Sequence, residues 1–304
     1  MKTDSQSAPQ PRRARRRIAK LIAGSLLVLV GCGAVAAWWV AGQLAAPARR
    51  AVGPPPQDLP YEAFKLQSES GASLAGWHIS NVGKRGVVVL LHAIRGSRAG
   101  MIGRARLFRD AGYSVVMIDL QSHGESTGEH ITFGFLERYD ALAAVKFAKS
   151  QHPGEPIAVV GVSLGGAAAL LASPLHIDAL ILESVYPTVG EAIDNRLRAR
   201  LGPLSSLASI ALQLQMKPRL GVSVDELRPI DKIAAADCPV LVLCGSDDRH
   251  TTAAQTRRLF DGAHEPKTLA IFPNAGHVDL ERFDPDFYKV QTLKFLASHM
   301  NTDD

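Results

Sequence analysis

The sequence predicts an α/β fold: a mostly parallel β-sheet with helices on both faces, preceded by one transmembrane helix. Two observations carry this prediction. Short apolar runs such as residues 86–91 alternate with amphipathic stretches, the pattern of repeated βα units whose strands are buried on both faces. Ahead of them, residues 21–48 contain no charged side chain. With 46% hydrophobic and 21% charged residues, the composition excludes a disordered chain, a collagen and a coiled coil.

The chain begins with a basic tail, residues 1–20. This tail carries a net charge of +6 whereas the whole chain carries +5, so the remaining residues together carry −1. Nucleic-acid binding needs a basic surface on the folded domain, and a nearly neutral body does not supply one. We therefore expect no nucleic-acid partner.

Residues 21–44 are predicted to be a transmembrane anchor. At ~1.5 Å rise per residue, the apolar positions of 21–40 span a hydrocarbon core of ~30 Å. Trp38 and Trp39 lie at the far end of this segment, where indole rings favour the headgroup layer. The basic tail favours a cytoplasmic N-terminus, so the rest of the chain is expected on the extracytoplasmic side, periplasmic or extracellular. The membrane is thus an expected partner.

Three alternatives to an uncleaved anchor stay open. A signal peptide cleaved near residues 34–36 (Ala-Val-Ala) has similar flanking charges but usually a shorter apolar core. Residues 29–32 resemble a lipoprotein processing box, in which Cys32 would be acylated. Residues 15–20 weakly resemble a twin-arginine signal. After the anchor, the Pro- and Ala-rich residues 45–60 predict a stiff linker to a globular domain at 61–304.

The globular domain is expected to alternate strands and helices. The strands are predicted at 61–67, 74–79, 86–91, 114–118, 157–162, 179–182, 240–244 and 268–272. The helices are predicted at 100–111, 135–150, 164–172, 252–260 and 285–298. The longer helical stretch 186–236 interrupts this alternation and is interpreted as an insertion. Ligands of such sheets bind at the carboxyl ends of the parallel strands, so the loops there are the candidate site.

The clearest motif is Gly-Val-Ser-Leu-Gly at residues 161–165. It closes a predicted apolar strand and opens a helix of small residues, which is the strand–turn–helix setting of a nucleophile elbow. Glycines on both sides of Ser163 allow the sharp turn that exposes a serine hydroxyl above a sheet. The alternative interpretation is a serine that only caps the helix.

A nucleophilic serine needs a base, and the base needs an acid that orients it. His277 follows the last predicted strand in an irregular loop and is the candidate base. Asp247 and Asp248 both follow the strand 240–244, and adjacent side chains cannot both face one imidazole. Glu183, at the end of the preceding strand, is the fallback acid.

These motifs together resemble an α/β-hydrolase-fold serine hydrolase of the esterase-like or prolyl-oligopeptidase-like branch. The matching blocks are short but are spread over nearly all of 61–300. They lie at residues 91–96, 119–126, 161–165, 245–248 and 276–277. The order Ser163, Asp248, His277 is the order of the family's catalytic triad. The resemblance implies that Asp248 is the acid, that Asp247 caps the turn or the next helix, and that residues 186–236 form a cap over the substrate pocket.

The same resemblance implies an oxyanion hole built from the backbone N–H groups of Ile94 and Leu164. His92 and Ala93 are then expected at the pocket, with His92 a hydrogen-bonded structural residue and not a base. The family commonly has His-Gly where this chain has His92-Ala93, and alanine does not tolerate a positive φ as glycine does.

We therefore expect a membrane-anchored serine hydrolase that cleaves an ester or thioester of a small acyl substrate through an acyl-enzyme intermediate. A serine peptidase of the same fold, or a non-catalytic binding module on this scaffold, are the alternatives. The sequence has no metal-ligand spacing and no dinucleotide or phosphate glycine loop, so no metal and no cofactor are expected.

Overall fold

The eight strands of the main sheet lie in the order β10-β9-β8-β7-β4-β5-β3-β2 in the computed structural model, which describes residues 11–300. Their bounds are β2 Glu62–Gln67, β3 Ser73–Ile79, β4 Val87–Leu91, β5 Ser114–Ile118, β7 Ile157–Val162, β8 Ala179–Glu183, β9 Val240–Gly245 and β10 Lys267–Phe272. Strand β3 is antiparallel to both β2 and β5, and all other neighbours are parallel. The predicted, mostly parallel sheet is confirmed.

The central strands are apolar runs because both of their faces are covered. In β4, Val88 and Leu90 point into one hydrophobic cluster, whereas Val87, Val89 and Leu91 point into the other. All five side chains are fully buried. Successive side chains of a strand face opposite sides of a sheet, so a strand in the middle of a three-layer fold has no polar face.

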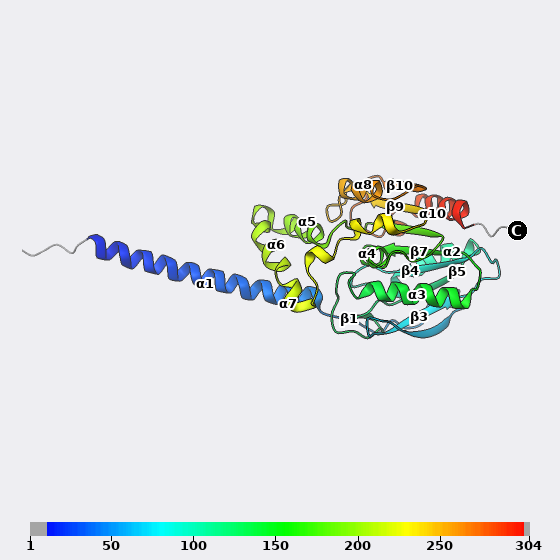
Figure 1. Cartoon of the computed structure of the whole chain (residues 1–304), viewed down its shortest axis with the longest axis horizontal. Helices are drawn as coiled ribbons and strands as arrows, with labels where there is room; N and C mark the ends of the chain where they lie inside the picture. Colours follow the sequence, from blue (N-terminus) through cyan, green and yellow to red (C-terminus); the bar gives the residue numbers. More distant parts are fainter. Residues whose placement is uncertain (1–10, 301–304) are drawn as a thin grey trace, which may run out of the picture.

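Helices cover both faces of this sheet (Figure 1). Helices α3 (Glu137–Gln151), α4 (Leu164–Leu171) and α8 (Ala253–Asp261) contribute to one core cluster. Helices α2 (Ile102–Asp110) and α10 (Pro285–His299) contribute to the other, next to the short α9 (Leu280–Phe283). The predicted helices on both faces are therefore confirmed.

The insertion between β8 and β9 is helical. It contains α5 (Val189–Leu201), α6 (Ser205–Gln213) and α7 (Met216–Leu220), followed by short 3₁₀ turns. Thr188 begins α5 as its N-cap, with its side chain accepting a hydrogen bond from the Glu191 amide. We keep the name cap for residues 186–236.

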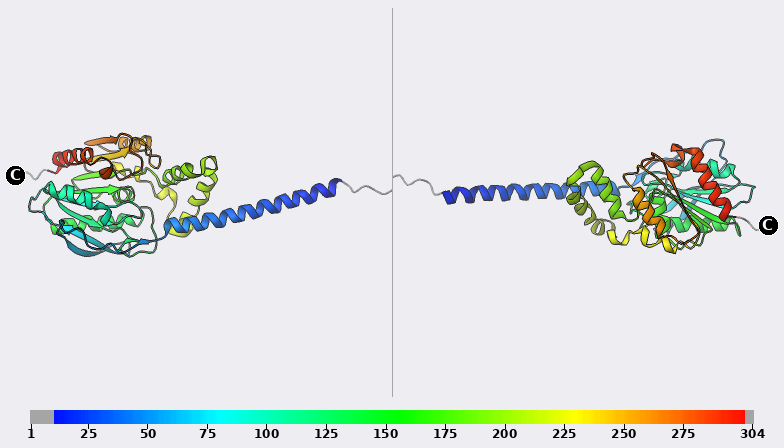
Figure 2. Two further views of the ribbon diagram at one scale, coloured as in Figure 1. Left: turned by 180° about the vertical axis from the view of Figure 1, so that it is seen from behind. Right: turned by 90° about the horizontal axis from the view of Figure 1, so that it is seen from above.

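Helix α1 (Pro11–Ala45) extends away from the rest of the molecule and touches it at one end (Figures 1 and 2). At that end the Ile131 amide donates to the Ala45 carbonyl at 2.9 Å, and Arg219 donates to the Trp38 carbonyl at 2.7 Å. Residues 15–45 have a mean hydropathy of 2.2 in their most apolar window, none of which is buried. This segment, which contains the predicted anchor 21–44, is long and apolar enough to cross a membrane, as signal sequences and some core helices also are.

Residues 45–60, predicted as a stiff linker, contact the domain along their length. Strand β1 (Ala48–Arg49) pairs in parallel with β6 (His123–Gly124), and the Arg50 amide donates to the Gly124 carbonyl at 2.7 Å. Further along, Leu59 is buried in the core. The proline and alanine content of a segment determines only its local stiffness. Here, backbone groups of the domain that would otherwise lack hydrogen-bond partners bond to this segment.

Candidate active site

Ser163 lies between β7 and α4 with φ +48° and ψ −103°, a strained backbone conformation for a residue with a side chain. Two glycines leave the space for this turn. A Cβ on Gly161 would lie 2.4 Å from the Gly166 Cα, and one on Gly165 would lie 2.3 Å from the Leu91 carbonyl oxygen. Strain of this kind persists only where the surroundings impose it and is common at catalytic residues. The backbone here has the form of a nucleophile elbow.

His277 and Asp248 are joined by a hydrogen bond of 2.8 Å between Nδ1 and Oδ2. The other carboxylate oxygen accepts from the backbone amides of His250 and Thr251, both at 2.8 Å. Burial raises the pKa of Asp248, but the hydrogen bonds from His277 and the two amides outweigh burial and hold that pKa below its ordinary value. An ionised Asp248 keeps the proton of His277 on Nδ1, which leaves Nε2 free to accept one.

The other two candidate acids point elsewhere. Asp247 is exposed, and its carboxylate accepts from the Ser246 hydroxyl at 2.9 Å. Glu183 is buried and accepts two hydrogen bonds from Arg104, at 2.9 and 2.6 Å. The structure therefore brings Asp248, and neither alternative, to His277.

The three sequence-predicted triad residues share one edge of the sheet. Ser163 follows β7, Asp248 follows β9 and His277 follows β10, and these strands run parallel in the order β10-β9-β8-β7. Ser163 is also tied to the intervening strand, because its amide donates to the Glu183 carbonyl at 2.8 Å. Ser163 is only 2% exposed, whereas the His277 side chain is 23% exposed.

His92 is a structural residue. Its Nδ1 donates to the Ala93 carbonyl at 2.7 Å, and its Nε2 accepts from the Leu120 amide at 3.0 Å. Burial lowers the pKa of His92 to about 3, so the ring is neutral. With both nitrogens engaged, His92 cannot act as a base. His92 is buried and its two hydrogen bonds hold the loop after β4 in place.

The loop that carries Ala93 and Ile94 does not need glycine at residue 93. Ala93 has a negative φ, and the left-handed residue of the loop is Arg95 at φ +57°. The Gly96 amide closes the turn by donating to the Ala93 carbonyl at 2.9 Å. Ile94 is half-buried, and Leu164, whose amide is the second expected donor, is buried.

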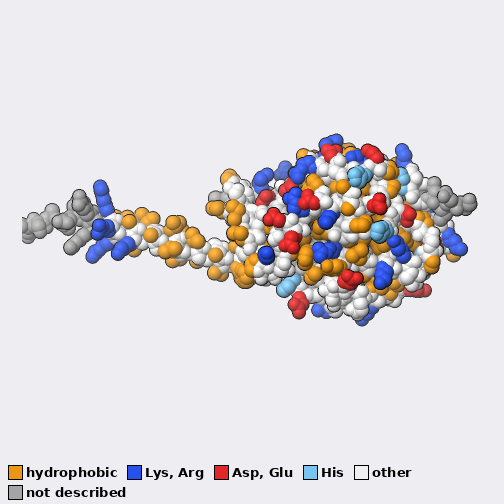
Figure 3. Space-filling view, viewed as in Figure 1, with side chains coloured by type: hydrophobic (Ala, Val, Ile, Leu, Met, Phe, Trp, Pro, Cys, Tyr) orange, Lys and Arg blue, Asp and Glu red, His pale blue; other side chains and the backbone are white. Residues whose placement is uncertain are grey.

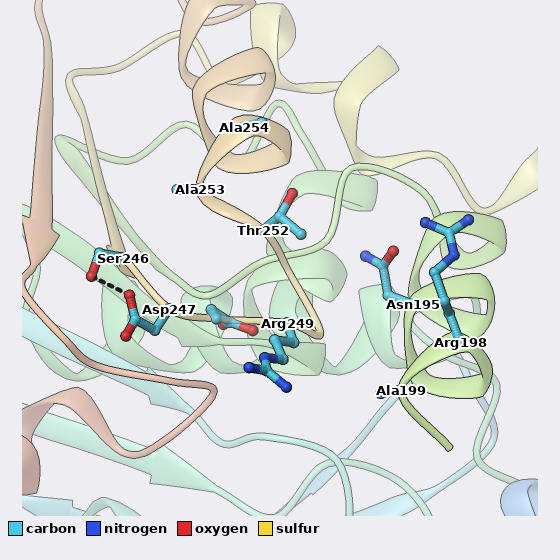
Figure 4. Close-up of a pocket in the computed structure, with 10 residues that line it drawn as sticks. Asn195, Arg198, Ala199, Ser246, Asp247, Arg249, Thr252, Ala253 and Ala254 are labelled. Atoms are coloured by element: carbon cyan, nitrogen blue, oxygen red, sulfur yellow. Dashed lines mark hydrogen bonds between the residues drawn. The ribbon is translucent and has the colours of Figure 1, made fainter. Parts of the chain in front are cut away.

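A cavity of about 650 Å³ separates the cap from the loop after β9 (Figure 4). It is lined by Asn195, Arg198, Ala199, Ser246, Asp247, Asp248, Arg249, Thr252, Ala253 and Ala254. Asn195 joins the two walls by donating to the His250 carbonyl at 3.1 Å and to Gln255 at 2.7 Å. Ser163 and His277 are not among the lining residues, so this space adjoins the acid and not the nucleophile.

A buried charge cluster that the sequence does not predict lies beneath the site. Arg104, on α2, bonds both to Glu183 and to Asp279, with a nitrogen–oxygen distance of 2.8 Å to the second carboxylate. The Tyr288 hydroxyl completes the cluster by donating to Glu183 at 2.5 Å. Asp279 caps α9 only two residues after His277, so the cluster links the strand beside Ser163 to the histidine loop. In the sequence, Arg104 is one of several arginines on an amphipathic helix, and nothing there marks it as buried.

Comparisons with known proteins agree with this architecture. The protein YqkD of Bacillus subtilis (strain 168) is 28% identical over 250 residues, which cover 79% of this chain and 80% of YqkD. Lysophosphatidylserine lipase ABHD12 of Danio rerio is 26% identical over 235 residues, covering 68% of this chain and 59% of the lipase.

Solved structures show the same fold. The Pyrococcus furiosus esterase PF2001 superposes with a TM-score of 0.70 at 21% identity, covering 85% of this chain and 99% of the esterase. The esterase domain of a Rhodothermus marinus protein superposes with a TM-score of 0.56 at 18% identity, covering 80% of this chain and all of that domain. The sequence pattern of the alpha/beta hydrolase family matches residues 88–288, more than half of the chain. The chain therefore belongs to the α/β hydrolase family.

Proposed function

We propose that this protein is a membrane-anchored serine hydrolase that cleaves an ester or thioester. The observation that supports the proposal most is the Nδ1–Oδ2 hydrogen bond between His277 and Asp248, at the sheet edge that also carries the strained Ser163. A triad is defined by such geometry and roles, whatever fold carries it. The Danio rerio relative is named as a lysophosphatidylserine lipase, which favours a lipid ester as the substrate class.

In the proposed reaction, Ser163 Oγ attacks the acyl carbon while His277 Nε2 takes its proton. The Ile94 and Leu164 amides hold the oxyanion that forms, and Asp248 stabilises the imidazolium. The intermediate collapses by expelling the alcohol or thiol, which takes the proton from His277 and leaves an acyl-Ser163. Water then attacks this acyl-enzyme by the same route and releases the carboxylic acid and free Ser163.

Labelling by a fluorophosphonate probe tests this proposal. The wild-type protein should be labelled, and Ser163→Ala should not be labelled although it folds normally. Asp247→Asn is the matched control and should be labelled like the wild type, because its carboxylate faces Ser246 and not His277. A folded wild-type protein that stays unlabelled would favour the non-catalytic binding module. A labelled protein that cleaves peptides and no esters would favour the peptidase.

The proposed location has its own support. The apolar part of helix α1 has the composition of a membrane span, and basic residues cluster in the helix just before that part. By the positive-inside rule the domain then lies outside the cytoplasm. Alkaline phosphatase fused to the C-terminus should be active, and β-galactosidase fused there should be inactive. The reverse result contradicts the proposed orientation.

A further inference from the structure

Helix α6 exposes large apolar side chains while it buries two serines. Its inward side buries Ser205, Ser209 and Leu212. Its outward side carries Leu207 and Ile210, 78% and 56% exposed, and Leu214, 73% exposed, follows directly after the last residue of the helix. These three residues are spaced by three and four positions and therefore form one stripe, the outer face of α6. A surface helix in water normally has the opposite arrangement, so this face is shaped for an apolar neighbour.

Hydrogen bonds fix α6 in this orientation. The Ser209 hydroxyl donates to Asp194 on α5, and Gln213 donates to the same carboxylate at 3.2 Å and to the Ser209 hydroxyl at 2.8 Å. Turning α6 to bury Leu207 and Ile210 would break these bonds and leave Asp194 without its donors. The exposure of this apolar face is therefore fixed by hydrogen bonds within the cap.

The cap lies beside the end of α1 that enters the domain. Helix α6 packs against α1, and the Arg219 guanidinium stacks on the Trp38 ring at 4.1 Å. The cap also extends along α1 away from the sheet, in both views (Figures 1 and 2). In Figure 3, apolar side chains on this edge of the cap continue into the apolar surface of α1. A membrane crossed by α1 would meet the outer face of α6 at its surface.

The charge of the cap fits a lipid surface. Residues 189–221 contain five basic side chains and two acidic ones, in a chain whose part after residue 20 carries −1. Arg198 and Arg200 on α5 and Lys217 on α7 are exposed, on the two helices adjoining α6. Basic groups that flank an apolar stripe are typical of helices that lie in the headgroup layer of anionic membranes.

We infer that the outer face of α6 lies in the headgroup and upper acyl region of the bilayer that α1 crosses, and that the enzyme takes a lipid ester from this bilayer. The inference rests on the proposed anchor and deepens the proposed function. Docked in this way, the cap brings the cavity beside Asp248 to the membrane surface, because α5 both lines that cavity and carries α6.

A depth measurement on the full chain tests the docking. Ile210→Cys and, as the matched control, Val82→Cys are labelled with an NBD fluorophore after Cys32 and Cys238 are replaced by serine, since Cys244 is buried. Val82 is 98% exposed and precedes β4, at the opposite end of the parallel strands from the cap. The proteins are placed one copy per nanodisc of phosphatidylcholine, with or without phosphatidylglycerol.

The probe at residue 210 should emit at shorter wavelength than the probe at residue 82. A lipid with a doxyl group high on its acyl chain should quench the first probe and spare the second, more strongly with phosphatidylglycerol. Equal spectra and equal quenching would overturn the docking. A blue shift seen only when each disc holds two copies would also overturn the docking, because the outer face of α6 would then contact a second copy of the protein and not the lipid. A chain that does not stay in the disc would instead refute the anchor.

Activity supplies a second readout. The triple change Leu207→Ser, Ile210→Ser, Leu214→Ser should lower hydrolysis of an ester lipid held in the bilayer by about tenfold, since three apolar contacts with the membrane are lost. Hydrolysis of water-soluble p-nitrophenyl acetate should stay unchanged, because none of these residues belongs to the catalytic site. Equal loss with both substrates, or no loss with either, would contradict the inference.

Discussion

Asp247 and Asp248 are neighbours in the chain, yet only one of them contacts the imidazole of His277. The Asp247 amide donates to the Ala275 carbonyl at 2.9 Å, which points its side chain toward Ser246 and solvent. The two residues therefore have different roles: Asp247 stabilises the turn, and Asp248 faces the imidazole of His277.

This difference predicts unequal effects on the reaction. Asp248→Asn should lower kcat by about 10⁴, because an amide favours the wrong imidazole tautomer. Asp247→Asn should change kcat far less. Steady-state kinetics on a p-nitrophenyl ester, with circular dichroism to confirm folding, measures both. A larger loss for Asp247→Asn would show that the histidine loop is placed differently in solution.

Ala93 gives a second test at this scale. Since its φ is negative, Ala93→Gly relieves no strain and only adds freedom to the unfolded chain. The variant should be less stable by about 0.4–1 kcal/mol. Its kcat should change less than about tenfold, because no oxyanion donor is removed. Thermal unfolding and ester hydrolysis decide this, and a higher Tm with a faster enzyme would contradict it.

At the scale of elements, the buried cluster around Arg104 joins parts that are distant in the chain. It links α2, the end of β8, the start of α9 and α10 through Arg104, Glu183, Asp279 and Tyr288. Burial lowers the pKa of Arg104, but the attraction of Glu183 outweighs it and raises that pKa well above its ordinary value. The guanidinium therefore stays charged inside the protein.

Arg104→Ala should destabilise the protein by about 3–5 kcal/mol, since it leaves the Glu183 carboxylate buried without its partner. Arg106→Ala is the control on the same helix, because Arg106 makes an exposed ion pair with Asp58. That control should hardly change stability. Urea unfolding measures both variants, and similar small losses would mean that water reaches the Arg104 cluster.

The long elements could be predicted from the sequence, whereas the short ones could not. The apolar runs 240–244 and 157–162 predict buried strands directly, because a strand covered on both faces must be apolar throughout. Strands β1 and β6 have two residues each, and α9 has four, which leaves no period to detect. The Ser163 motif and the His277 loop could be predicted from the sequence, because a strained turn and a strand end both favour glycine, and glycines stand two positions on either side of Ser163 and directly before His277. The Arg104 cluster was not, because its partners meet only in the folded chain.

At the scale of the whole molecule, Asp140 couples stability to pH. This carboxyl, buried on α3, accepts from the Ser68 hydroxyl at 2.6 Å and from the Gln121 amide at 2.7 Å. Burial, with a smaller contribution from Glu137, nevertheless raises the pKa of Asp140 from 3.8 to about 7. Between these two pH values the folded chain keeps a proton that the unfolded chain has lost.

The contribution of Asp140 to stability is therefore fully present below pH 4 and is lost as pH rises to about 7. The free energy of unfolding of Asp140→Asn should lack this fall, on the order of a few kcal/mol. Urea unfolding of both proteins at several pH values measures the difference. Parallel pH profiles would mean that the hydrogen bonds keep Asp140 ionised.

Truncation tests how far the proposed anchor and the domain are independent. Removing residues 1–44 keeps Ala45, whose carbonyl accepts from Ile131, and keeps the β1–β6 pairing. The shortened protein should fold and hydrolyse soluble esters. It should still bind anionic vesicles through α6, and high salt should release it. If the shortened protein does not bind vesicles, all of the membrane affinity resides in α1.

The clamp between Arg219 and Trp38 has a kinetic consequence. In the proposed membrane-anchored hydrolase, this stacking and the pairing of β1 with β6 would hold the domain at a short, nearly fixed distance from the bilayer. An enzyme held in this way would meet the proposed lipid substrate by lateral diffusion in two dimensions. Its rate should follow the mole fraction of substrate among the surrounding lipids, and adding inert lipid should slow it even when the total substrate in suspension is unchanged.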